Sequence, residues 1–278
     1  MKISMFVYPE IEVWALRGKV ELSQSVELRP LPTVPLRGIL GHALKAVDPL
    51  LVEMYFKPGA DGSRPPAFIL QPILPIPVRG QEFFFDLYLW GDPSELEPGL
   101  RIAFFQMEGA AFSGKGASIR SIQLSEMERI QFEGLHQSLP TECILHLKTP
   151  LCLKTHDRDR NKKRPALANE IDVSKVLMSL ASRVRNLVHF YGAGEDWDPS
   201  PYLEAGKEGL VLKRKLKPVC IRRNSSARGN RFVLNGYTGA LHLGNLEPLA
   251  MELATLGSLF HVGHHTQEGC GMTAVEVT

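Results

Sequence analysis

The sequence has few cysteines and no long apolar run. Its four cysteines are scattered without a CxxC pair, which argues against a disulfide framework and a cysteine zinc site. No apolar stretch reaches the roughly 20 residues of a membrane span, and residues 1–14 lack the basic start and cleavage site of a signal peptide. With 44% hydrophobic and 22% charged residues, the composition is typical of a globular protein without a membrane partner, which we expect in the cytoplasm.

The common phosphate-binding motifs are also missing. Residues 261–271 form a segment with Gly263, Gly269 and Gly271, but the segment lacks the Gly-Lys-Ser/Thr ending of a P-loop. The segment is not a GxGxxG dinucleotide-binding motif either, because that motif precedes a helix, whereas a strand-like stretch, 272–277, follows here. Because glycines let backbone amides approach a phosphate closely, the segment favours a polyanionic ligand. We call residues 261–271 the glycine loop.

Positive charge is concentrated in two segments, although the net charge is only +2. Residues 207–231 contain nine basic side chains and one acidic side chain, Glu208, which leaves a local charge of +8. Residues 154–164 contain six basic side chains and two aspartates, which leaves +4. Such segments are either solvated loops or polyanion-binding surfaces, and two of them beside a glycine loop point to nucleic acid.

The two halves of the chain repeat one order of elements. Strand-like patterns cover 13–28, 67–74, 82–90 and 117–124 in the first half and 143–153, 209–221, 231–243 and 272–277 in the second. Helical spacing covers 35–47, 96–107, 169–190 and 246–260. Both halves read β-α-β-β-α-β, the ferredoxin-like order, and both have a glycine-containing turn, 109–116 or 263–271, before the last strand. The sequence therefore predicts an α+β protein of two tandem ferredoxin-like domains, 1–130 and 140–278.

Several segments resemble one known family in their order and spacing over nearly the whole chain. They are PLRGILGHAL (35–44), YF (55–56), RPPAFIL (64–70), FDLYLWG (85–91), GKG (114–116), HFYG (189–192), RRNSSARG (222–229), GALHLG (239–244) and LGSLFHVG (256–263). In these the chain resembles the CRISPR-associated endoribonucleases of the RAMP superfamily, which process precursor crRNA. The resemblance implies paired ferredoxin-like (RAMP/RRM-like) domains.

The glycine loop departs from the family pattern. After HVG the family usually continues with Lys-Gly, then Thr, an aromatic residue and Gly-x-Gly. Here His264 and His265 stand at the Lys-Gly positions, and Glu268 replaces the aromatic residue. A carboxylate that faced a phosphate would repel it.

The resemblance implies RNA cleavage without a metal or cofactor, by attack of a ribose 2′-hydroxyl that leaves a 2′,3′-cyclic phosphate. Histidine suits the proton transfers because both of its protonation states exist near neutral pH. His42 is the first candidate, since Gly38, Gly41, His42 and Lys45 share the polar face of the helix 35–47. The two glycines lower helix propensity, so we expect RNA, the facing sheet or the other domain to pack on them. Lys45 is the candidate charge stabiliser and Tyr55 a candidate orienting hydroxyl.

His264 and His265 offer alternatives. They form an acid/base pair, contact RNA phosphates as exposed loop residues, or bind a metal with His261 and Cys270, although no further ligand pattern supports zinc. The basic segments supply the remaining candidates, because Lys213, Lys215 and Lys217 alternate along one strand face while Arg214 points away. The predicted RNA-binding residues are Arg37, Lys115, Lys154, Arg158, Lys213, Lys215, Lys217, Arg222, Arg223, Ser225, Ser226, Arg228, Arg231, His264 and His265.

The resemblance thus implies an endoribonuclease that binds CRISPR repeat RNA, cuts it to crRNA and works beside other subunits of a CRISPR effector complex. A RAMP subunit that binds guide RNA without cleaving it is the alternative. A small-molecule enzyme that uses the glycine loop for nucleotide phosphates is a third, which the basic segments argue against.

Overall fold

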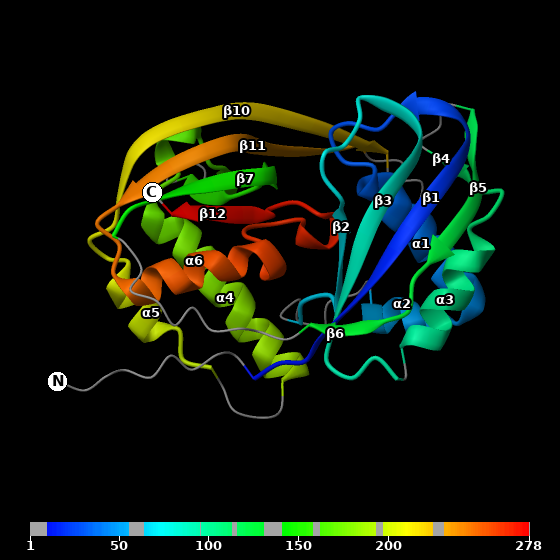
Figure 1. Ribbon diagram of the computed structural model, residues 1–278, viewed down its shortest axis with the longest axis horizontal. Coiled ribbons are helices and arrows are strands. Elements are labelled where there is room, and N and C mark those ends of the chain that lie inside the picture. Colours follow the sequence, from blue (N-terminus) through cyan, green and yellow to red (C-terminus); the bar gives the residue numbers. More distant parts are fainter. Residues whose placement is uncertain are drawn as a thin grey trace.

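The computed structural model describes residues 10–55, 64–94, 96–112, 116–130, 141–157, 162–192, 197–224 and 231–277. The first half forms a sheet with strand order β2-β3-β1-β5-β4, and β6 pairs with the start of β1. The strands are β1 (Val13–Glu27), β2 (Phe68–Pro72), β3 (Arg79–Trp90), β4 (Ala111–Phe112), β5 (Ala117–Leu124) and β6 (Glu128–Ile130). Helices α1 (Thr33–Val47) and α3 (Glu97–Gln106) bury Leu36, Leu40 and Leu100 in one core with this sheet. Figure 1 shows these helices beside the sheet.

The second half repeats this arrangement. Its sheet has the order β10-β11-β7-β12, formed by β7 (Cys143–Leu151), β10 (Leu210–Asn224), β11 (Arg231–Gly244) and β12 (Thr273–Val277). Helices α4 (Val173–Tyr191) and α6 (Pro248–Phe260) lie on one side of the sheet (Figure 1). In both sheets the first and third strands of the repeat are central, as in a ferredoxin-like fold. The predicted α+β fold of two tandem ferredoxin-like units is confirmed.

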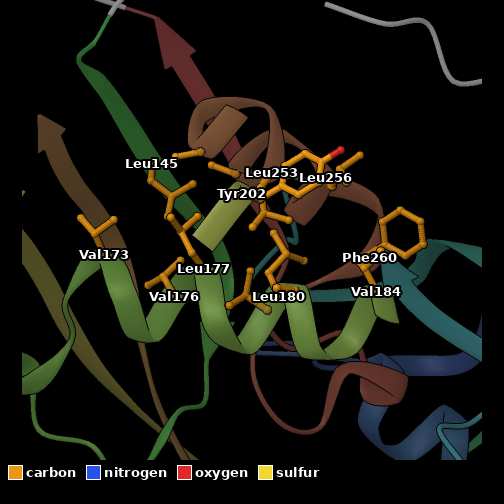
Figure 2. Packing of buried hydrophobic residues seen from close by; sticks show 14 of the residues in the cluster. Leu145, Val173, Val176, Leu177, Leu180, Val184, Tyr202, Leu253, Leu256 and Phe260 are labelled. Atoms are coloured by element: carbon orange, nitrogen blue, oxygen red, sulfur yellow. The ribbon is translucent and has the colours of Figure 1, made fainter. Parts of the chain in front are cut away.

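Helix α4 shows how the apolar spacing produces the second unit. Its buried residues include Val176, Leu177, Leu180 and Val184, which recur every three or four positions and face Leu253 and other residues of α6 (Figure 2). The helix begins at Val173, because the Asp172 carboxylate accepts the backbone N–H of Lys175 at 2.7 Å as an N-cap. The predicted start at 169 was too early, since Ala168–Glu170 form a separate 3-10 turn, η1.

The elements that the sequence did not predict are short. They are helices α2 (Pro49–Tyr55) and α5 (Ser200–Ala205), strands β4 and β6, and the hairpin of β8 (Lys154–Asp157) with β9 (Lys162–Pro165). Each is too short to show a hydrophobic period. The hairpin lies in the basic segment 154–164, where charge concealed the strand pattern.

Each unit contributes side chains to the hydrophobic core of the other. Ile221 of β10 and Leu234 of β11 are paired across the hairpin and are buried in the core of the first unit. Trp90, at the end of β3, is buried in the core of the second unit, where its ring stacks on Phe260 at 5.2 Å. The boundaries 1–130 and 140–278 stay a prediction. None of the helices in the described ranges has the length and hydropathy of a membrane span.

Candidate functional site

Helix α1 presents the predicted catalytic pair on an open surface. Leu36, Leu40 and Leu44 are buried, whereas His42 and Lys45 are exposed on the opposite face. A methyl group built on Gly38 would meet no described atom within 4 Å. We expected RNA, the facing sheet or the other unit to pack against the glycines of this helix. At Gly38 neither the sheet nor the other unit does so. Tyr55 ends α2, which packs against α1, but its side chain lies outside the described residues.

The glycine loop, in contrast, is packed against the rest of the chain. Within it, Val262 N–H donates to Gly271 O at 2.8 Å, His264 N–H to Cys152 O at 2.8 Å, and Gly271 N–H to Pro150 O at 3.0 Å. The N–H groups of Glu268, Gly269 and Cys270 also donate to carbonyls of the loop. These amides are occupied by the chain's own carbonyls, so the expected use of this loop as a cradle of backbone amides for phosphate is wrong for these six groups.

Glu268 points inward, so its carboxylate does not face a phosphate at the surface. The side chain is 1% exposed, and its Oε1 lies 3.7 Å from Nη1 of Arg37. Its backbone carbonyl accepts the Thr33 hydroxyl at 2.7 Å. Since Arg37 is itself buried, at 7% exposed, it joins the start of α1 to the loop. The predicted RNA contact of Arg37 stays a prediction, and this burial does not favour it.

His261 has a packing role at the start of the loop. Its ring is completely buried, Nδ1 donates to Cys270 O at 2.9 Å, and Nε2 lies 2.8 Å from the Gln71 side chain of β2. Burial lowers the pKa of His261 to about 3, so the imidazole is neutral at pH 7. Because both ring nitrogens have partners, His261 does not fit the suggested metal site with His264 and His265. Among the described residues no cluster of metal-binding side chains occurs.

A basic cluster surrounds the exposed edge of the loop. The β8–β9 hairpin brings Lys154 and Lys163 toward His264, whose pKa is lowered to about 4 by partial desolvation and by the charges of Lys154, His265 and Lys163. His265 is partly exposed and lies beside the buried Glu268, with Nδ1 3.6 Å from Oε2. The adjacent histidines thus meet different groups, which does not favour an acid/base pair. The structure adds Lys163, which belongs to the basic segment 154–164 but is not among the predicted RNA-binding residues.

The C-terminal sheet carries a second basic surface on the side away from α4 and α6. Lys213, Lys215 and Lys217 lie opposite His242, Ala240 and Thr238 in the β10–β11 register. All three lysines are exposed, and none forms an ion pair with an acidic side chain in the described ranges. Arg214 lies opposite the buried Leu241, and its guanidinium donates to Ile171 O. The predicted alternation of side chains along this strand is confirmed.

The remaining predicted RNA-binding residues cannot be placed by side chain. Arg222, Arg223 and Arg231 belong to β10 and β11, but only their backbone is described. Lys115, Arg158, Ser225, Ser226 and Arg228 lie outside the described residues.

The two candidate catalytic regions are separate. Thr33 touches the loop, and His42 lies nine residues farther along α1, about 14 Å at 1.5 Å per residue. His42 thus lies toward the other end of α1 from the contact with the glycine loop.

Solved structures of low sequence identity share this fold. A solved structure described as a RAMP protein binding different RNA substrates has a TM-score of 0.51 at 13% identity and covers 94% of this chain and 99% of that chain. A Cas6 product complex has a TM-score of 0.62 at 16% identity, covering 95% and 100%. Thermus thermophilus Cas6 has a TM-score of 0.59 at 15% identity, covering 96% and 99%.

A family model matches the second unit of the chain. Residues 145–273 match the family model described as CRISPR-associated endoribonuclease Cas6. No curated protein sequence matches the chain. The resemblance to CRISPR RNA-processing endoribonucleases that the motifs indicated is thus confirmed.

Proposed function

We propose that this chain is a metal-independent endoribonuclease that binds CRISPR repeat RNA and cuts it to crRNA in the cytoplasm. The observation that carries the proposal is the open surface of α1, where His42 and Lys45 are exposed beside the unfilled space above Gly38. The Cas6-like fold and the family match support it. One solved relative is a product complex, which fits a role in RNA cleavage.

In the proposed reaction, a ribose 2′-oxygen attacks the neighbouring phosphorus and the bond to the 5′-oxygen breaks. The products are a 2′,3′-cyclic phosphate and a 5′-hydroxyl. His42 removes the 2′-hydroxyl proton or delivers a proton to the leaving oxygen, because an imidazole nitrogen can accept or donate a proton. The Lys45 ammonium stabilises the extra negative charge on the phosphate oxygens. Tyr55 is proposed as the orienting hydroxyl.

RNA binding is assigned to the two basic surfaces. The exposed lysines of β10 would follow the phosphate backbone, and Lys154, Lys163 and His264 would hold a second stretch at the loop. A bound phosphate would neutralise the positive field that lowers the pKa of His264. Other subunits of a CRISPR effector complex are the proposed protein partners.

The test is cleavage of repeat RNA in EDTA by wild type, His42→Ala and His264→Ala. We expect cleavage at one position, and a loss of about 10²- to 10⁴-fold in rate for His42→Ala, because a general acid or base contributes this much. RNA affinity should change little, and His264→Ala should keep most of the rate. Equal rates for wild type and His42→Ala would refute the role of His42. Binding without cleavage by wild type would instead support the non-catalytic RAMP subunit.

A further inference from the structure

A cavity of about 290 Å³ lies where the end of β3 meets the end of α4, away from the proposed catalytic surface. Its lining includes Arg64, Trp90, Gly91, Asp92 and Tyr191. None of its lining residues belongs to α1, the glycine loop or the basic strands. The volume is at the small end of the range for ligand pockets, which suits one base rather than a base pair.

Two side chains in one wall of the cavity are held in place by hydrogen bonds. The Tyr191 hydroxyl donates to Pro65 O at 2.6 Å, and Arg64 Nε donates to the same hydroxyl at 3.2 Å. The Arg64 guanidinium lies 5.2 Å from the centre of the Tyr191 ring. Guanidinium and phenol groups held in this way offer flat faces on which an unpaired base stacks.

Trp90 lines the cavity as part of the core. Its side chain is 1% exposed, and its ring stacks on Phe260 with the ring centres 5.2 Å apart. Its Nε1 is buried in the described structure, so this donor does not reach a ligand in the cavity.

Asp92 supplies an ionised acceptor at the rim. Its Oδ1 accepts the backbone N–H of Ser94 at 2.8 Å, and this bond holds the pKa of Asp92 below its ordinary value. No basic side chain in the described ranges forms an ion pair with this exposed carboxylate. Its charge is therefore available to groups that donate hydrogen bonds.

We propose that this cavity binds an unpaired guanine base. Guanine carries two adjacent donors, N1–H and N2–H, which match the two oxygens of the Asp92 carboxylate. The ring of the base stacks on Arg64 and Tyr191. On their pairing edges adenine, cytosine and uracil place an acceptor beside each donor, and that acceptor repels a carboxylate.

The guanine belongs either to a free nucleotide or to the RNA. Binding of a guanine of the RNA rests on the proposed function. Two binding experiments separate these sources. The first measures the affinity for GMP, IMP and AMP, where IMP lacks the N2 amine. The second replaces each guanine of a repeat RNA by inosine, one at a time, and measures the affinity for each RNA.

Each experiment uses wild type, Asp92→Asn and Asp198→Asn. Asp198 is the matched control, because it also precedes Pro-Ser and accepts the N–H of Ser200 at 2.9 Å, but it does not line the cavity. Wild type should discriminate guanine from hypoxanthine by about 10- to 100-fold, as expected for a hydrogen bond to a charged group. Asp92→Asn should remove this preference, and Asp198→Asn should keep it.

Discrimination of GMP identifies a free nucleotide, and discrimination at one RNA position identifies an unpaired base of the transcript. The proposal is overturned if neither experiment shows a guanine preference that depends on Asp92, even where cleavage by His42 persists. If the chain ignores RNA, the proposed function fails while the GMP measurement still decides the cavity.

Discussion

The two glycine-containing turns that precede the last strands of the two units have opposite surroundings. Gly109 in the first turn and Gly271 in the second both have a φ of 81°. A Cβ on Gly109 would meet nothing within 4 Å, whereas a Cβ on Gly271 would lie 1.9 Å from Val262 O. The first turn needs glycine for its conformation alone, and the second also needs it for close packing. The equivalent position in a repeated fold thus has a different physical role in each unit.

The largest expected effect is that of Gly271→Ala. The new methyl group overlaps Val262 O, and the positive φ adds strain, so we expect a loss of about 3 kcal/mol or more in the free energy of unfolding. Gly109→Ala is the control, since it carries the same φ without the overlap and should cost only about 1 kcal/mol. Urea denaturation measures both. Equal losses would show that the two turns do not differ as described.

An intermediate effect is expected from His261, which fixes the second turn to β2. In the unfolded chain it binds a proton as the pH falls through about 6.5, but in the folded chain only near pH 3. The contribution of His261 to the free energy of unfolding is therefore fully present above pH 6.5, and it decreases as the pH falls below 6.5. The decrease is about 2 kcal/mol at pH 5. The urea midpoint of wild type should exceed that of His261→Asn by more at pH 7.5 than at pH 5. An equal difference between the two proteins at both pH values would contradict a neutral buried imidazole.

The smallest effect is expected from a third glycine, on α1. Because no described atom lies within 4 Å of a Cβ on Gly38, Gly38→Ala should stabilise the helix by about 1 kcal/mol. If RNA occupies the space above Gly38, the same change should weaken RNA binding several-fold. Thermal unfolding and RNA titration measure the two consequences. Higher stability with unchanged RNA affinity would exclude a close RNA contact at Gly38.

The sequence could predict the long elements because each has a clear hydrophobic period. The strand at β1 and the helix at α4 were found within a few residues, and the lysine alternation on β10 followed from the two-residue repeat of a strand. The β8–β9 hairpin was missed, since four-residue strands rich in charge have no such period. Lys163 therefore entered the cluster around His264 only in the structure.

By itself the sequence determined the order of elements, the basic surfaces and the resemblance to a family, because these depend on neighbouring residues. Tertiary structure decided which candidate side chains are buried and which are exposed. Arg37 and Glu268 are 231 positions apart, yet they meet inside the protein, while His42 stays exposed. Burial depends on how distant segments pack, and a local pattern of residues does not contain that information.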